Sequence, residues 1–202
     1  QSTRVGSRPL GPDFTAMAKW GAKLVRLQVW PVFTARVQKK ELWAAWPDLL
    51  AAVEEEARAA DATGLKVIID LHEPPLTGVD GQTAAGWRHP ELGTNLLRIW
   101  RDLASRLKPL GAAIYGYDLL NEPLDRGQLP NAPREWRPLA VQLVQAIRAI
   151  DRDAWIIYES GPGGLCWGVK DLEPLPDSRI IYSPHYYSPH PFTHQGIAEI
   201  VG

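Results

Sequence analysis

The sequence has very little cysteine and no long apolar run. Its one cysteine, Cys166, excludes a disulfide within the chain and a metal site made of several cysteines. No apolar run reaches the length of a transmembrane helix, and the net charge of -1 gives no excess of basic residues for nucleic acid or an acidic membrane. We therefore expect no membrane contact, no nucleic-acid partner and no cofactor. No signal peptide follows Gln1, which leaves the compartment open, secretion included.

Apolar and aromatic residues are plentiful instead. Of the 202 residues 45% are hydrophobic, which suits one domain, residues 1–202, with a sizeable core. No low-complexity stretch indicates a second domain. The nine tryptophans are a high count for this length, and flat indole rings are surfaces on which sugars stack. We expect five of them only to pack against other residues: Trp20, Trp43, Trp46, Trp100 and Trp155.

Segments typical of strands alternate with segments typical of helices along the whole chain. Residues 65–71 are almost unbroken in apolar character, as in strands buried on both faces of a parallel sheet. This alternation predicts an α/β fold with a parallel sheet and right-handed crossovers. We expect strands at 23–30, 65–71, 112–120, 154–159 and 179–187, helices at 13–20, 38–63, 91–108 and 132–151, and a loop at 74–90.

The stretch 112–123, AAIYGYDLLNEP, begins as a strand and ends in Asn121, Glu122 and Pro123. Proline lacks an N–H for the ladder and favours extended backbone before it, so we expect Pro123 to end the strand with Glu122 extended. Parallel α/β proteins place their chemistry at this end of the strands. A carboxyl group over an apolar interior can donate a proton near neutral pH. The alternative is a solvated glutamate beside a turn proline.

Polar or aromatic residues occur at the same end of five successive strands. Each has an ordinary alternative, because a histidine after a strand is usually solvated or satisfied by its neighbours. Their occurrence at one edge, above apolar strands, indicates a functional site. The residues are Arg26 and Trp30, His72 and Glu73, Asn121 and Glu122, Glu159, and His185 and Tyr187.

Four motifs carry a resemblance to a known family. They are VRLQVW with Arg26, DLH with His72, LLNEP with Asn121 and Glu122, and HYY with His185 and Tyr187. With these motifs in this order, the chain resembles the family 5 glycoside hydrolases, of the clan of retaining (β/α)₈ glycosidases. The resemblance covers most of the chain, and LLNEP is its specific motif. Members of the family cleave β-glycosidic bonds, most often in β-1,4-glucans and also in mannans.

The resemblance implies a role for each matched residue. Glu122 would be the general acid/base, and Asn121 would hold the sugar 2-hydroxyl. Arg26 would lie beneath the carboxylates and keep the nucleophile ionised. Retaining cleavage needs two carboxyl groups about 5–5.5 Å apart. The remaining roles are His72 and His185 as walls of the cleavage subsite, Trp30 as a stacking surface, and Tyr187 as the residue that orients the nucleophile.

The chain departs from the family in its number of strands. A full barrel has eight strands and about 250 residues, whereas we expect about five strands here, without the family's first strand and last two strands. The family's nucleophile on strand seven and its stacking tryptophan after strand eight then have no counterpart. We expect a partial TIM-type (β/α) barrel with unpaired edges near Lys23 and Arg179, and a homo-oligomer that covers these edges.

The second carboxylate therefore has to come from elsewhere. Glu159 is the first candidate, because it ends the strand next to that of Glu122 and neighbouring strands lie about 4.8 Å apart. Its alternative role is a structural partner of Arg26 or of a loop amide. Glu73 is the second candidate, and Glu199 could reach a neighbouring subunit. If none serves, a water-activated route or no catalysis remains.

Loop residues add further candidates. Trp167 is expected to be a sugar platform or a contact with a partner subunit. His190 and His194 could suggest a metal together with the histidine of the last strand, but proline breaks the segment and no helical ligand spacing occurs, so we favour ordinary loop histidines. Asp118 is expected on the same side of its strand as Glu122, as a buried charge partner.

These residues together predict a glycoside hydrolase that acts on β-linked glucosides or β-1,4-glucan, with Glu122 as the general acid/base. The alternative is a catalytically weak or inactive sugar-binding remnant of the same fold, which keeps Trp30, Trp167 and the polar rim. Activity lost in a Glu122 variant that still binds sugar would favour the enzyme. Binding without turnover in the unaltered chain would favour the remnant.

Overall fold

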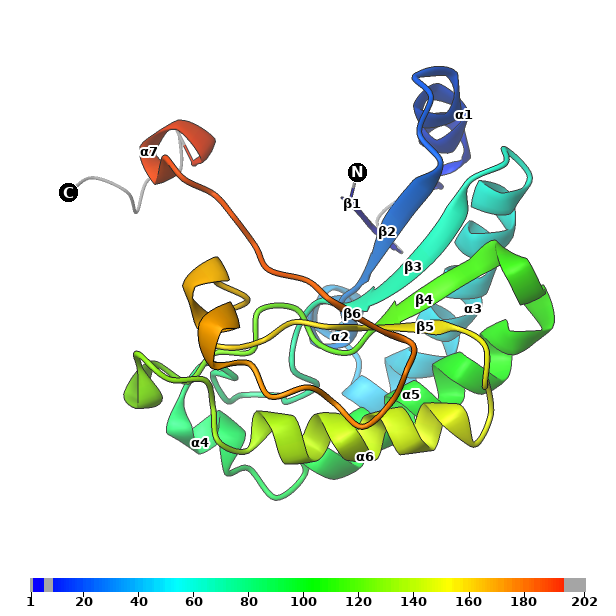
Figure 1. Ribbon diagram of the computed structural model, residues 1–202. Helices are drawn as coiled ribbons and strands as arrows, with labels where there is room; N and C mark the ends of the chain where they lie inside the picture. The colour runs from blue at the N-terminus through cyan, green and yellow to red at the C-terminus, as the bar shows by residue number, and fades with distance from the viewer. Residues whose placement is uncertain (1, 6–8, 195–202) are drawn as a thin grey trace.

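Six parallel strands form one sheet in the computed structural model, which describes residues 2–5 and 9–194 (Figure 1). Each strand pairs with the next strand of the chain. This arrangement confirms the predicted α/β class and the partial barrel. The strands are β1 Ser2–Arg4, β2 Leu24–Val29, β3 Lys66–Leu71, β4 Ile114–Asp118, β5 Trp155–Tyr158 and β6 Ile180–Tyr182.

Helices connect the strands and cover the sheet. Figure 1 shows the three longest, α3, α5 and α6, packed along one side of the curved sheet. Within the described residues, no helix has the length and apolar character to cross a membrane. The α-helices are α1 Gly11–Lys19, α2 Pro31–Gln38, α3 Leu42–Asp61, α4 Ala84–Trp87, α5 Leu92–Leu107, α6 Trp136–Arg148 and α7 His190–Thr193, and the 3-10 helices are η1 Lys108–Ala113, η2 Arg126–Gln128 and η3 Cys166–Asp171.

The two faces of the sheet differ in chemistry. In β2 the side chains of Val25, Leu27 and Val29 are fully buried in the core, whereas Arg26 and Gln28 alternate with them and point to the opposite face. The same period of two continues through the next three strands. It places one acidic residue from each on the face of Arg26, namely Asp70, Asp118 and Glu159.

Strand β1 corrects one prediction. Ser2 pairs with Arg26 in a parallel ladder, so a strand does precede β2, and the edge near Lys23 is covered. The outer strands of the described sheet are β1 and β6. A strand of three residues, Ser, Thr and Arg, has no apolar pattern that could indicate it, because its conformation is imposed by pairing with β2.

Some element boundaries also differ from the prediction. The helix expected at 38–63 begins only at Leu42, as α3, and α2 before it was not predicted. Lys39 adopts φ 54° and ends α2, and the N–H of Lys40 closes the turn on the carbonyl oxygen of Ala35 at 3.0 Å. No glycine marks this break. The strand expected at 179–187 ends at Tyr182, and His185 lies beyond it, in an isolated bridge with Leu165.

The tryptophans expected only to pack fall into two groups. Trp46 and Trp100 are buried in the core, and Trp43 packs partly against it beneath the guanidinium of Arg98. Trp155 is half-buried, with Arg179 near its ring. Trp20 is 77% exposed at the end of α1, so the prediction for this residue is wrong.

Candidate active site

Arg26 stands at the centre of the polar face of the sheet. Its guanidinium meets one carboxylate from each of the next three strands: Nη1 lies 2.9 Å from Oδ2 of Asp70, Nε 2.9 Å from Oδ2 of Asp118, and Nη2 2.8 Å from Oε1 of Glu159. Nη2 also donates to Oδ1 of Asn121 at 3.0 Å. One fixed fork of donors therefore ties the carboxyl ends of β3, β4 and β5 to β2.

Three buried carboxyl groups share this one guanidinium. Asp70 and Glu159 are 0% exposed and Asp118 is 1% exposed. Burial raises the pKa of Asp70 and of Asp118 well above the usual value, although the charge of Arg26 acts in the opposite direction. In the part of the chain that the structure describes, Oδ1 of each aspartate has no hydrogen-bond partner.

Glu122 lies just beyond β4, with 37% of its side chain exposed. Its φ is 47°, so it is in the left-handed region and not in the extended conformation that we expected before Pro123. The N–H of Glu122 donates to Oε2 of Glu159 at 2.6 Å, and this long-range contact outweighs the local preference. A non-glycine residue in this region carries strain of about 1–3 kcal/mol, and such residues gather at functional sites.

His185 joins the two glutamates. Its Nδ1 lies 2.7 Å from Oε1 of Glu122, and its Nε2 lies 3.0 Å from Oε1 of Glu159. Each ring nitrogen needs its own proton to bond a carboxylate, so this geometry holds the imidazolium form. The hydrogen bonds to Glu122 and Glu159 raise the pKa of His185 to about 10. The two carboxylates thus lie on opposite sides of one charged ring.

Glu159 is held on every side. Oε1 accepts from Arg26 and His185, and Oε2 accepts from the backbone N–H of Glu122. The loop after β5 closes over it: Gly164 has φ 67°, and a Cβ at this position would lie 2.9 Å from Oε2 of Glu159. The structure therefore shows the arrangement that we weighed as the alternative for Glu159, a partner of Arg26 and of a loop amide.

His72 occupies the other side of Arg26. Its Nδ1 lies 2.5 Å from Oδ2 of Asp70, and its Nε2 lies 3.2 Å from the amide nitrogen of Gln28. Burial, together with the nearby charge of Arg26, lowers the pKa of His72 to about 4. The ring of Trp30 lies beside that of His72, with centroids 4.6 Å apart and planes inclined at 40°. Histidine and tryptophan thus form one wall.

A cavity of about 580 Å³ lies beside this wall. Its lining includes the reactive groups predicted from three strand ends: Trp30, His72, Glu73, Asn121 and Glu122. Glu122 therefore faces a space shared with His72 and is hydrogen-bonded to His185. This size suits a small polar ligand.

Three tryptophans fix the backbone near these strand ends, a role that the sequence did not reveal. The indole N–H of Trp100 donates to the carbonyl oxygen of Leu119 at 3.0 Å, and that of Trp136 to the carbonyl oxygen of Glu159 at 2.8 Å. Trp87 donates to the carbonyl oxygen after Pro123, that of Leu124, at 2.7 Å. A buried tryptophan usually finds a partner for its N–H, but nothing in the sequence says which carbonyl it will be.

The other candidates lie outside this network. Glu73 lines the cavity, but its carboxylate accepts from the N–H of Phe33 in the first turn of α2 at 2.7 Å, and burial raises its pKa. Trp167 is 43% exposed on η3 and does not line the cavity. Tyr187 is 45% exposed, with its ring edge against His185.

The histidines of the C-terminal segment make no metal cluster within the described residues. The ring centroids of His194 and Tyr187 lie 5.0 Å apart, and Nδ1 of His194 lies 2.9 Å from the hydroxyl oxygen of Thr193. Glu199 lies outside the described residues.

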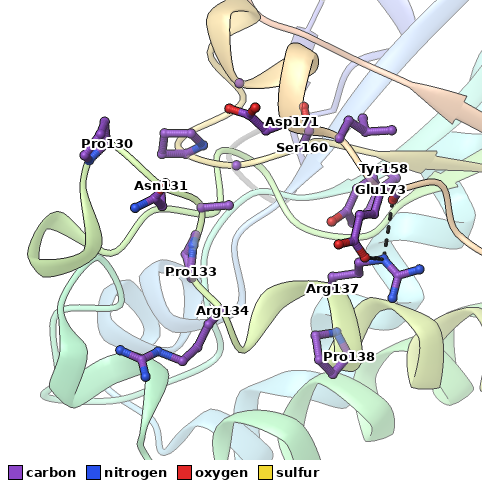
Figure 2. A pocket seen from close by; sticks show the side chains of 15 residues that line it. Pro130, Asn131, Pro133, Arg134, Arg137, Pro138, Tyr158, Ser160, Asp171 and Glu173 are labelled. Carbon is purple, nitrogen blue, oxygen red and sulfur yellow. Dashed lines mark hydrogen bonds and ion pairs between the residues drawn. The ribbon is translucent and has the colours of Figure 1, made fainter.

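A second cavity, of about 400 Å³, lies on the helix side of the sheet, between the start of α6 and η3 (Figure 2). Tyr158 and Ser160 line it from the end of β5, and an ion pair between Arg137 and Glu173 crosses its side. It shares no lining residue with the cavity of Glu122.

The parallel βα units and the polar groups at the carboxyl ends of their strands define a protein of the (β/α)-barrel class, whose sites lie at that end. Comparison with known proteins names the family. The chain belongs to glycosyl hydrolase family 5, because the family model for Cellulase (glycosyl hydrolase family 5) matches residues 4–199. This confirms the resemblance seen in the four motifs.

Individual relatives are similar over parts of their length. Endoglucanase C of Acetivibrio thermocellus is 31% identical over 132 residues, which cover 65% of this chain and 37% of that protein. Cellodextrinase A of Ruminococcus flavefaciens is 27% identical over 193 residues, which cover 91% of this chain and 53% of that protein. A hyperthermophilic endo-beta-1,4-glucanase, solved in complex with substrate, superposes with a TM-score of 0.76 at 25% identity, over 97% of this chain and 58% of that chain. The chain thus spans between about a third and three fifths of these relatives.

Proposed function

We propose that the chain is a glycoside hydrolase that cleaves β-linked glucosides or β-1,4-glucan, with Glu122 as the general acid/base. The relatives are named as an endoglucanase, a cellodextrinase and an endo-beta-1,4-glucanase, which supports this substrate class. The observation that carries the proposal is the placement of Glu122. Its carboxyl group faces a cavity of about 580 Å³ and is hydrogen-bonded to His185. Its backbone is in the left-handed region of φ.

The neighbours of Glu122 suit a sugar at this position. Asn121 lines the same cavity, and its side-chain oxygen is held by Arg26, so its amide N–H₂ group is left to donate to a sugar hydroxyl. Trp30 and His72 offer flat rings to the face of a pyranose. In this arrangement the proton between His185 and Glu122 passes through the Glu122 carboxyl group to the glycosidic oxygen as the bond to the anomeric carbon breaks, and His185 is left neutral.

The second carboxylate is proposed to be Glu159, with one condition that the geometry imposes. Its carboxylate has no exposed surface, and His185 stands between it and Glu122. It can meet an anomeric carbon only after the loop that carries Gly164 withdraws from it. Arg26, whose Nη2 lies 2.8 Å from Oε1, would hold the carboxylate in place.

The same burial favours a second candidate function, a sugar-binding module without turnover. If Glu159 stays an anchor, the carboxylates of the cavity lining besides Glu122 are Glu73, which accepts from the N–H of Phe33, and Asp80, which is paired with Arg126, so neither is poised as a nucleophile. Trp30 and Asn121 would still bind sugar, and Trp167 could contact it from η3. A protein of either function would bind the sugar, but only the glycoside hydrolase would cleave it.

The test compares Glu122→Gln with the unaltered chain on β-1,4-glucan and on aryl β-glucosides. We expect a fall of about 10²–10⁴-fold on the glucan, because the leaving sugar needs a proton. The fall should be smaller on an aryl glucoside whose phenol leaves easily without one. Retained binding of a cello-oligosaccharide, by calorimetry, shows that the cavity is intact.

Glu55→Gln, on the exposed side of α3, is the matched control and should leave activity unchanged. Equal losses on both substrates would contradict a general acid. Binding by the unaltered chain without any turnover would establish the module. Glu159→Gln, assayed alongside, should abolish turnover if Glu159 is the nucleophile.

We further propose that copies of the chain associate through the outer strands of the sheet. Each of β1 and β6 has one strand neighbour in the described sheet, and unpaired edges invite pairing with another chain. Tyr186 and Phe192, at 73% and 70% exposed, lie beyond β6. Light scattering that shows a stable monomer would contradict this association.

A further inference from the structure

Gln28 joins two residues of the cavity wall through a short chain of hydrogen bonds. The indole N–H of Trp30 donates to Oε1 of Gln28 at 3.3 Å. Nε2 of Gln28 lies 3.2 Å from Nε2 of His72, and Nδ1 of His72 lies 2.5 Å from Oδ2 of Asp70. Gln28 and Asp70 are direct partners in the ladder between β2 and β3, so the backbone itself places these two members on either side of His72.

The direction of each bond follows from chemistry. An indole N–H can only donate, so the oxygen of the Gln28 amide faces Trp30 and its N–H₂ group faces His72. The amide N–H₂ can only donate, so Nε2 of His72 must accept and carries no proton. The remaining proton of the neutral ring is then on Nδ1, where it is donated to Asp70.

We propose that Gln28 is a positioning residue, which holds His72 as the neutral ring with its proton on Nδ1 and fastens Trp30 beside it. Its value for catalysis rests on the proposed function, because the wall formed by these two rings is the surface against which a pyranose would lie. An uncharged His72 keeps this wall free of a cation. It also leaves His185 as the charged histidine that bonds Glu122.

Several charged groups surround His72 and act on its protonation. Arg26 and burial oppose a second proton, as does His185, whereas the carboxylates favour it. Burial is the largest of these influences, and the Gln28 donor at Nε2 acts in the same direction, against a second proton. The groups are Arg26 from β2, Asp70 from β3, Glu122 after β4, Glu159 after β5 and His185 after β6.

Gln28→Glu is the sharpest test, because it keeps the size and the acceptor for Trp30 but reverses the contact with His72. A carboxylate facing Nε2 requires a proton there, so His72 should become the imidazolium at pH 7. Gln28→Met removes the donor without adding an acceptor. The pKa of His72, followed by ¹⁵N and ¹H NMR of the ring between pH 4 and 9, should rise from the unaltered chain to Gln28→Met and further to Gln28→Glu.

Gln142→Glu and Gln142→Met, on the exposed side of α6, are the matched controls and should leave the His72 signals unchanged. Circular dichroism of all variants checks folding, and Gln28→Met still decides the question if Gln28→Glu does not fold. The proposal is overturned if His72 keeps one pKa in all folded variants, or if the unaltered chain carries a proton on Nε2.

The consequence for binding is a separate readout. If the proposed function holds, Gln28→Glu should raise KM several-fold with little change in kcat, because the wall is altered and the acid is not. The NMR result needs no substrate. An inactive chain with the expected order of His72 pKa values would therefore refute the function and leave the role of Gln28 standing.

Discussion

Each of the two sides of the site holds a histidine, and the pKa values of the two rings are shifted in opposite directions. On the side of β3, His72 lies between an acceptor and a donor, Asp70 and Gln28, and its pKa is lowered to about 4. Beyond β6, His185 lies between two acceptors, Glu122 and Glu159, and its pKa is raised to about 10. Both rings are largely buried.

The difference teaches that burial alone does not decide the charge of a histidine here. For His72 burial is the largest cause and the charge of Arg26 adds to it, whereas for His185 the hydrogen bonds to two carboxylates outweigh burial. Arg26 contacts the carboxylate partner of both histidines, so it is the element that the two sides share.

Removal of the Arg26 side chain should have the largest effect, both on the free energy of unfolding and on the contrast between the two histidines. Arg26→Met leaves Asp70, Asp118 and Glu159 buried without a cation, and loss of one partner of a buried ion pair costs about 3–5 kcal/mol. The pKa of His72 should rise, because the charge of Arg26 lowers it. Chemical denaturation measures the free energy of unfolding, and NMR follows His72.

Arg152→Met, at an exposed position before β5, is the control and should change the free energy of unfolding by no more than about 0.5 kcal/mol. If Arg26→Met lowered the free energy of unfolding no more than Arg152→Met does, the buried carboxyl groups would already be protonated and would need no cation.

Removal of His185 should have a smaller effect that depends on pH. The folded-state pKa of about 10 lies above the ordinary 6.5, so the folded state binds more protons between these values. Its contribution is fully present below pH 6.5 and is lost as the pH rises through 10. His185→Gln should therefore cost about 1.5–3 kcal/mol near pH 6, the usual worth of a hydrogen bond to a charged group.

The difference in unfolding free energy between His185→Gln and the unaltered chain should shrink steadily from pH 6.5 to 10. Measurements across this range with one denaturant check it. A difference that stays constant would mean that His185 is neutral in the folded chain, and the contrast with His72 would disappear.

Removal of the Tyr187 hydroxyl should have the smallest effect. The sequence resemblance implies that Tyr187 orients the nucleophile, but among the described residues its hydroxyl bonds no carboxylate, and its ring contacts only the rings of His185 and His194, edge to face. Tyr187→Phe should therefore change the free energy of unfolding by less than about 0.5 kcal/mol. A larger loss of unfolding free energy, or a lowered pKa of His185 measured by NMR, would show that the Tyr187 hydroxyl makes the contact predicted from the sequence.

Much of this arrangement could be predicted from the sequence. The apolar runs and their spacing predict the parallel sheet, and the strand expected at 112–120 contains β4, which ends at Asp118. Asp118 was expected as a buried charge partner, and it is paired with Arg26. These successes share one physical basis, since the period of two in a strand fixes which side chains share a face.

The rest depended on contacts between distant residues. Glu122 was expected to be extended, and the amide bond to Glu159 turned it into the left-handed region. The partners of the two histidines lie on other strands, so no local pattern could tell that Gln28 faces one of them. Strand β1 was too short to predict, because pairing with β2 alone creates it.

The left-handed backbone at Glu122 has a consequence for how this chain can change. Glycine and asparagine adopt that conformation with little strain, whereas a residue with a branched or long side chain is strained in it. Replacement of Glu122 by either of them would relieve this strain and remove the proposed proton donor in the same step. At this one residue, therefore, a substitution that favours the stability of the backbone is one that removes the chemistry proposed for it.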